Sequence, residues 1–164
     1  MKKATIFLLF LQLALFATGQ ESSSGYNVLK LHTSAHVAAL GGENISIIEN
    51  DASTAWHNPA LLANVTTNTV AFNFMTYFAE SKWMGAHYVR AFGQRHTGGI
   101  TIQYMDYGSQ AETDVQGNVV GEFSAKDIIV APSYSYLLSE KWSGGATLKM
   151  AYSSYDSYSA MELG

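Results

Sequence analysis

Apolar and polar side chains alternate with a period of two from Thr67 onward. This alternation is typical of β-strands that have one apolar face. It predicts about five strands of roughly ten residues each, the length that a tilted strand needs to cross a bilayer. The expected strands cover 70–78, 83–92, 100–105, 127–138 and 144–153. The second strand fits the pattern least well, because His87 and Arg90 interrupt both of its faces.

Two residues within the alternating strands lead to expectations of their own. Pro132 lies inside the fourth expected strand and lacks the N–H that a strand ladder needs, which predicts a bulge there. Lys149 lies on the polar face of the fifth strand, where we expect it to pair with Asp127.

Tyrosines near the strand ends would suit the aromatic girdles of a membrane barrel. These tyrosines are Tyr77, Tyr104, Tyr107, Tyr134, Tyr136, Tyr152, Tyr155 and Tyr158.

The connections between the expected strands differ in length. Residues 93–96 and 139–141 are short turns, whereas 106–121 is a long polar loop rich in Gly, Asp, Gln and Asn. In a meander the two short turns fall at one end of the sheet and the long loop at the other. Short turns at one rim and longer loops at the other are typical of outer-membrane barrels. A secreted soluble β-sandwich also alternates and is the alternative, but strand length and low charge favour the barrel.

Residues 20–66 have a different pattern, with short helical segments instead of alternation. We expect helical turns over 35–40, 52–56 and 59–63, and a short strand over 44–49. Thr33 or Ser34 can cap the first turn, Asp51 or Ser53 the second, and Asn58 the third, with Pro59 at its first position. Gly41 and Gly42 end the first turn. Elements this short cannot form a core alone, so they must pack on the sheet.

The first nineteen residues read as a secretory signal peptide. A basic start is followed by an apolar run over 4–16 and by small residues up to Gly19, so cleavage is expected between Gly19 and Gln20. A transmembrane anchor needs about 20 apolar residues, more than this run contains. The expected organisation is therefore a signal peptide over 1–19, an N-terminal plug segment over 20–66, and the first barrel strands over 67–164.

Composition narrows the classes of function. The 164 residues are 48% hydrophobic and only 13% charged, with a net charge of −4 and no cysteine. Average soluble domains carry about a quarter charged residues. The hydrophobic content excludes disorder, the missing cysteines exclude disulfide scaffolds and lipid attachment, and the acidic balance disfavours nucleic-acid binding.

The expected fold class is all-β, the N-terminal part of an antiparallel transmembrane β-barrel. About five strands cannot close a bacterial barrel, which needs an even number of at least about eight. Residues 160–164 read as the beginning of another strand. We therefore expect a fragment of a longer barrel; several chains sharing one barrel is the alternative.

A block over 29–63 carries a resemblance to a known family. Its pattern is a small-residue helix, an Ala-Leu-Gly-Gly stop, an acidic residue and an Asn-Pro-Ala-Leu turn. The residues that match are Ala39, Leu40, Gly41, Gly42, Asp51, Asn58, Pro59, Ala60 and Leu61. This block resembles the PorV/PorQ family of outer-membrane proteins, which is related to the long-chain fatty-acid transporter barrels. Residues 75–81 and 85–89 resemble the PorQ branch more closely.

The resemblance implies a barrel of about fourteen strands in the outer membrane of Bacteroidota, with the N-terminal segment in the lumen as a plug. It also implies a non-enzymatic component of the type IX secretion system that holds a surface partner, similar to PorZ, in the attachment complex. The loop over 106–121 is the expected docking surface. The alternative function is a passive transporter of hydrophobic small molecules.

Candidate chemistry is sparse. His57 near Asp51 and several serines suggests a hydrolase, but no Gly-x-Ser-x-Gly elbow surrounds any serine. His32 and His36 have helical ligand spacing without a third ligand nearby. The remaining histidines, His87 and His96, are scattered. We therefore expect no catalytic residue, metal or cofactor.

Overall fold

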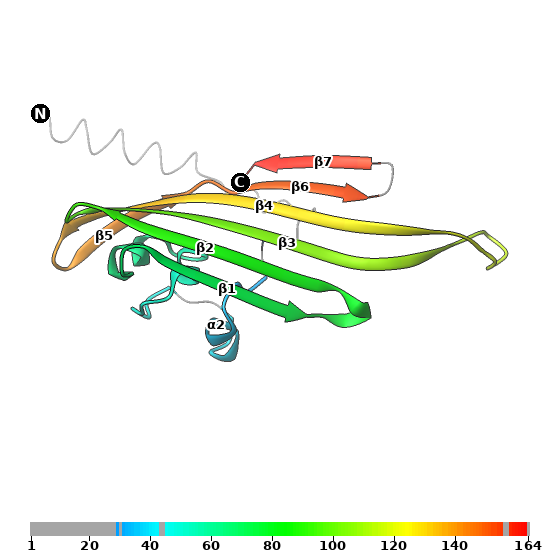
Figure 1. The fold of residues 1–164 in the computed structure, drawn as a ribbon, viewed down its shortest axis with the longest axis horizontal. Coiled ribbons are helices and arrows are strands. Elements are labelled where there is room, and N and C mark those ends of the chain that lie inside the picture. The colour runs from blue at the N-terminus through cyan, green and yellow to red at the C-terminus, as the bar shows by residue number, and fades with distance from the viewer. Residues whose placement is uncertain (1–28, 30, 43–44, 156–157, 164) are drawn as a thin grey trace, which may run out of the picture. The chain divides into compact units, whose positions relative to one another are not determined.

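The computed structural model describes residue 29 and residues 31–42, 45–155 and 158–163. The chain comprises two compact units, Met1–Lys30 and Leu31–Gly164, and nearly all described residues belong to the second. The expected signal peptide and its cleavage site between Gly19 and Gln20 lie outside the described residues. Within the second unit, an antiparallel sheet is accompanied by short helices that precede its first strand or follow it (Figure 1).

The helices are short and begin at the expected caps. They are α2 (Ala35–Ala39) and the 3-10 helices η2 (Ala52–Trp56), η3 (Pro59–Asn64) and η4 (Phe78–Glu80). The side chains of Ser34, Asp51 and Asn58 accept hydrogen bonds from backbone N–H groups of the first turns of α2, η2 and η3, which confirms these caps. Among the described residues, no helix has the length and apolar character needed to cross a membrane.

The strand expected over 44–49 is wrong. Residues 45–49 form bends and coil. The carbonyl of Ile45 accepts a hydrogen bond from Asn58 Nδ2 at 2.7 Å, so a side chain takes the place of a strand partner. Ile45 is 68% exposed, and the alternation of Ile45 with Ile47 therefore does not reflect packing on one face.

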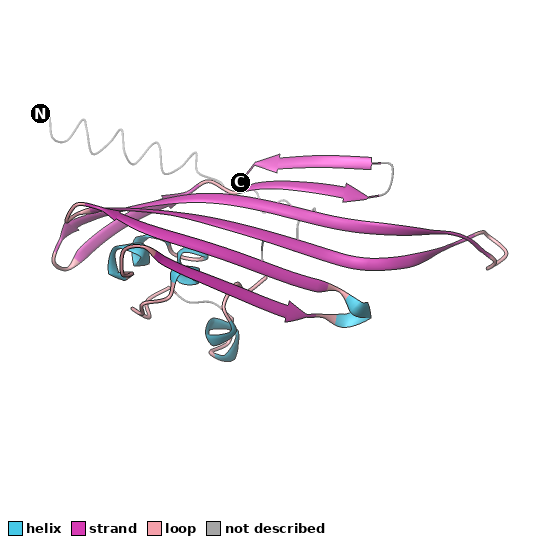
Figure 2. Ribbon diagram, in the orientation of Figure 1, coloured by secondary structure: helices cyan, strands magenta, loops and turns pink. Residues whose placement is uncertain are grey.

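The sheet is antiparallel throughout and confirms the all-β class (Figure 2). Its order is β1-β2-β3-β4-β6-β7, and β5 also pairs with β4. The strands are β1 (Thr69–Thr76), β2 (Lys82–Phe92), β3 (His96–Thr113), β4 (Val119–Ser139), β5 (Trp142–Thr147), β6 (Met150–Tyr155) and β7 (Tyr158–Leu163). The last strand corresponds to the further strand expected near 160–164.

The fifth expected strand is divided into β5 and β6 opposite Pro132. The register runs through Pro132 without a shift on the β3 side, where Pro132 pairs with Ile100, so the expected bulge is wrong. On the other side, Leu148 N–H donates to the carbonyl of Pro132 at 3.1 Å, but the proline ring has no N–H to return. The ladder therefore breaks at Leu148 and Lys149, between β5 and β6.

The expected loop over 106–121 is also wrong, because most of it is strand. β3 has 18 residues and β4 has 21, and they continue as a two-stranded hairpin past the ends of β2 and β6 (Figure 1). The turn lies at Asp114–Asn118, where Asp114 N–H donates to Asn118 O at 2.9 Å. A hairpin exposed on both faces needs no apolar side, so its polar sequence resembles that of a loop.

The two faces of the sheet differ in polarity. The helices η2 and η3 pack on one face, here called the inward face, and the opposite side is the outward face. Buried side chains of the inward face are polar at Thr101, Gln103, Asp127, Ser133, Ser135 and Ser153, and apolar at Trp83, Val89, Met105, Ile129, Ala131 and Ala151. Exposed side chains of the outward face include Phe72, Phe74, Met84, Tyr88, Ile100, Ile102, Ile128, Tyr134 and Tyr152. The outward set confirms the apolar face expected from the alternation.

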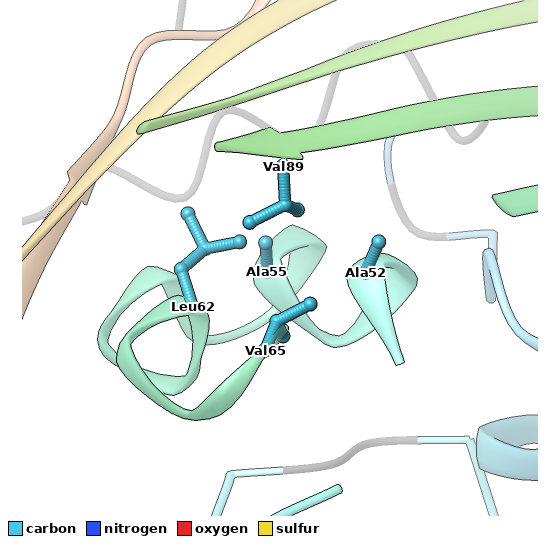
Figure 3. Packing of buried hydrophobic residues seen from close by; sticks show 5 residues of the cluster. All are labelled: Ala52, Ala55, Leu62, Val65 and Val89. Carbon is cyan, nitrogen blue, oxygen red and sulfur yellow. The ribbon is translucent and has the colours of Figure 1, made fainter. Parts of the chain in front are cut away.

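A small hydrophobic core joins the helices to the sheet. Ala52 and Ala55 of η2, Leu62 of η3 and Val65 pack against Val89 of β2 (Figure 3). In Figure 3 the side chains of Leu62 and Ala55 point toward the β2 ribbon that carries Val89. This contact fixes the position of the helices on the inward face near the short β2–β3 turn.

Candidate functional site: the inward face and the helical segment on it

The Asn-Pro-Ala-Leu turn is held against β4 and β5. Ser135 Oγ on β4 donates to the carbonyl of Ala60 at 3.2 Å. Gly145 on β5 lies so close that a Cβ there would sit 2.6 Å from Ala60 N and from the carbonyl carbon of Pro59. Because both neighbours are backbone atoms, only glycine permits this approach. The helical segment, residues 31–66, is therefore fixed to the sheet at this point.

Leu62 makes a second close contact with the sheet. Its side chain is fully buried, and its Cδ1 would lie 3.3 Å from a Cβ placed on Gly99 of β3. Leu61, the last residue of the expected motif, is also buried. The motif thus acts through backbone approach and apolar packing, which is a structural role.

Asp51 connects the first two helices. Its carboxylate accepts hydrogen bonds from Ser53 N–H at 2.9 Å, Ser53 Oγ at 2.6 Å and Ser34 Oγ at 3.0 Å. Burial alone would raise the pKa of Asp51, but the hydrogen bonds from Ser53 and Ser34, with a smaller contribution from the charge of His87, hold this pKa below its ordinary value. The ionised carboxylate is therefore the form that stabilises the junction of α2 and η2.

The Ala-Leu-Gly-Gly run ends α2. Gly41 and Gly42 have φ angles of 106° and 102°, the left-handed conformation expected for a helix stop. A Cβ on Gly42 would meet the imidazole of His32, whereas Gly41 faces open space. Ala39 and Leu40 are exposed. Of the two glycines, Gly42 is therefore the one whose lack of a side chain leaves room for a neighbour, the imidazole of His32.

The expected pair between Lys149 and Asp127 is wrong. Lys149 Nζ lies over the ring of Trp56, 4.0 Å from its centroid. Asp127 accepts a hydrogen bond from Tyr107 Oη at 2.6 Å, so Tyr107 points inward rather than joining an outer girdle. Lys149 lies at the break between β5 and β6, and this break brings it over η2 instead of over β4.

Buried polar groups gather on the inward face beyond the helices. His87 Nδ1 and Thr101 Oγ1 are hydrogen-bonded at 3.0 Å. Gln103, Asp127 and Ser153 are each almost fully buried and contain polar atoms without a hydrogen-bond partner. Sequence reasoning singled out only Asp127 of these three. The available signal was the presence of Gln103 and Ser153 on the face opposite to the apolar positions of their strands.

The remaining histidines lie apart. His32 and His57 have ring centroids 6.0 Å apart, and His36 Nδ1 lies 2.9 Å from Glu49 Oε2 at the surface. Within the described ranges, no group of three or more His, Asp or Glu side chains could hold a metal ion. The carboxylate of Asp51, which a hydrolase would need beside His57, accepts hydrogen bonds from serines instead.

The outward face contains a shallow apolar groove of about 330 Å³. It lies over β1, β2 and β3, and its lining includes Phe72, Phe74, Met84, Ala86, Ile102 and Tyr104. Ala86 is the small residue between Phe72 and Ile102 in the register, which explains the depression. Phe72 is 79% exposed, so this surface would be unfavourable in water.

The chain matches no known family model, no curated protein and no solved structure. The features that bear on function are therefore the polarity of the two faces, the contacts of the helical segment and the motif resemblance.

Proposed function

We propose that this chain forms part of an outer-membrane β-barrel of the type IX protein secretion system. In this proposal the helical segment occupies the lumen and the β3–β4 hairpin holds a surface partner of the attachment complex, as in the PorQ-like branch. The observation that carries the proposal is the polarity of the sheet, whose outward face exposes apolar side chains while its inward face buries polar side chains among apolar ones. Outer-membrane strands alternate in this sense, apolar toward lipid and polar toward the lumen.

Charged residues lie at both ends of the apolar part of the outward face. Lys82, Asp106 and Lys126 are paired across β2, β3 and β4 and form one charged row. On β2 the next outward charge is Arg90, and Met84, Ala86 and Tyr88 lie between. Eight residues at about 3.4 Å each span about 27 Å along the strand, or about 21 Å across the membrane at a tilt of about 40°, compared with an apolar band of about 25 Å in membrane barrels. The charged row would lie at one membrane surface.

The positions of the turns agree with this orientation. The short β2–β3 and β4–β5 turns lie at the end of the sheet opposite to the tip of the β3–β4 hairpin (Figure 1). The hairpin continues beyond the charged row of Lys82, Asp106 and Lys126, so it would project from the membrane on the long-loop side. In outer-membrane barrels that side is extracellular, which suits a docking element for a surface protein.

A passive transporter of hydrophobic molecules is the less favoured function. It needs a continuous apolar path through the barrel. The polar residues Thr101, Gln103, Asp127 and Ser153 interrupt the apolar residues of the inward face, and its end near the short turns is covered by η2 and η3. These features support a sealed structural barrel.

The proposal is tested with the full-length protein expressed in its own cell envelope. One variant deletes residues 110–123 and closes the hairpin with a two-residue turn; the control replaces Glu140 and Lys141 by alanine in the turn at the opposite rim. Quantitative affinity purification should recover surface proteins of the attachment complex with the wild type and the control, and several-fold less with the hairpin variant. Outer-membrane localisation without any such co-purification would overturn the attachment function.

A further inference from the structure

Three oxygen-bearing side chains on neighbouring strands of the inward face are buried and contain polar atoms without a hydrogen-bond partner. Gln103 on β3 and Asp127 on β4 are each 1% exposed, and Ser153 on β6 is 0% exposed. Both amide atoms of Gln103, Oδ1 of Asp127 and Oγ of Ser153 have no hydrogen-bond partner. A buried polar atom left without a partner costs about 1–3 kcal/mol, so native proteins rarely gather several.

The register brings these groups together. Asp127 is directly paired with Ser153 across β4 and β6, and with Met105 across β3 and β4. Directly opposed Cβ atoms on one face lie about 5 Å apart. Gln103 is two residues from Met105 on the same face, a diagonal neighbour of Asp127 within reach of a long side chain.

The carboxyl group of Asp127 has no basic side chain as a partner in the part of the chain that the structure describes. Tyr107 Oη donates to Asp127 Oδ2, which leaves Oδ1 open. The basic side chains on the inward face are engaged elsewhere: Lys149 lies over Trp56, and His87 bonds to Thr101. Burying a charge without a paired opposite charge is unfavourable, and a bound cation would supply a positive charge at this position.

We propose that Asp127, Ser153 and Gln103 form a binding site for a hard divalent cation of the Ca²⁺ type. Carboxylate, amide and hydroxyl oxygens are the ligands that such cations prefer, and water completes the coordination. With a single carboxylate the site is weak, with a dissociation constant of about millimolar. The site is independent of the proposed secretion function, because it depends only on the sheet register.

Terbium luminescence tests the site, since Tb³⁺ replaces Ca²⁺ and is sensitised by nearby aromatic rings. Tyr107 contacts Asp127 and would serve as the sensitiser. In the purified full-length protein in detergent, Tb³⁺ should give sensitised emission that excess Ca²⁺ displaces. Asp127→Asn should reduce this emission at least about five-fold, whereas Asp114→Asn, at the exposed hairpin turn, should leave it unchanged.

Ser153→Ala provides a second variant if Asp127→Asn does not fold. It removes one ligand and a small volume, and it should weaken Ca²⁺ displacement of Tb³⁺ at least about three-fold. Ca²⁺ should also raise the thermal unfolding temperature of the wild type and not that of Asp127→Asn. Equal emission in wild type and both site variants, or an unfolding temperature of the wild type insensitive to Ca²⁺, would overturn the site.

Discussion

Ser135 donates a hydrogen bond to the carbonyl of Ala60, although the two residues are 75 positions apart in the sequence. The bond joins the C-terminal part of β4 to the first turn of η3. Beside it, Gly145 lets the backbone of Pro59 and Ala60 approach β5 within contact distance. The helical segment is thus a fixed part of the inward face, attached through backbone atoms of its Asn-Pro-Ala-Leu turn.

Gly145→Ala should destabilise this attachment. The new Cβ would lie 2.6 Å from two backbone atoms that cannot move independently of η3, so we expect a loss of about 1–3 kcal/mol in the free energy of unfolding. Gly144→Ala is the matched control, because its Cβ would meet only Leu138 Cδ1 at 3.7 Å. Urea unfolding of both variants measures the difference, and equal stability would contradict the close contact.

Lys149 and Trp56 should be energetically coupled. A cation over an aromatic ring at 4.0 Å contributes about 0.5–2 kcal/mol, depending on how much water is excluded. A double-mutant cycle with Lys149→Met and Trp56→Leu should give a coupling energy in this range. Lys141→Met, in the exposed β4–β5 turn, serves as the control and should not couple to Trp56→Leu. A coupling energy near zero for Lys149 would exclude a stabilising contact.

Asp51 should make stability depend on pH. Because its folded-state pKa lies below the ordinary value of 3.8, its ionised form contributes stability that is fully present above that value and is lost as the pH falls through the folded-state pKa. Asp51→Asn keeps a capping oxygen but removes the charge, so the variant should be less stable at neutral pH.

The difference in unfolding free energy between wild type and Asp51→Asn should shrink as the solution is acidified below about pH 4. Asp114→Asn is the control: Asp114 also has a lowered pKa, because of hydrogen bonds from Asn118 and neighbouring N–H groups, but it lies at an exposed turn. Its substitution should leave global unfolding unchanged. A difference for Asp51→Asn that is constant with pH would contradict the ionised cap.

The features predictable from sequence were those set by neighbouring residues. The caps Ser34, Asp51 and Asn58 bond to N–H groups two or three positions away, so short-range chemistry identifies them. The exposed apolar positions of β1 and β3 follow from strict alternation. The signal peptide, the barrel and the secretion function remain predictions.

The expectations that proved wrong concern residues whose structure is determined by contacts with segments far away in the sequence. The hairpin ends of β3 and β4 are strands because residues 106–113 pair with residues 119–126, and their polar composition gives no sign of this pairing. Lys149 contacts Trp56 because η2 lies beneath the break between β5 and β6. The alternation of residues within a single strand cannot reveal such a contact. The close approach of Gly145 to η3 likewise depends on packing between segments far apart in the sequence.

The most direct test of the proposed barrel is a cysteine scan along β3, which these 164 residues permit because they contain no cysteine. Single cysteines at positions 99–104 of the full-length protein in lipid vesicles are spin-labelled, and accessibility to oxygen and to a water-soluble nickel complex is measured. Labels at Ile100, Ile102 and Tyr104 should be accessible to oxygen and shielded from nickel, with the alternate positions shielded from oxygen. Nickel accessibility at Ile100 and Ile102 equal to that of an exposed hairpin position such as Val115 would contradict a lipid-facing outward surface.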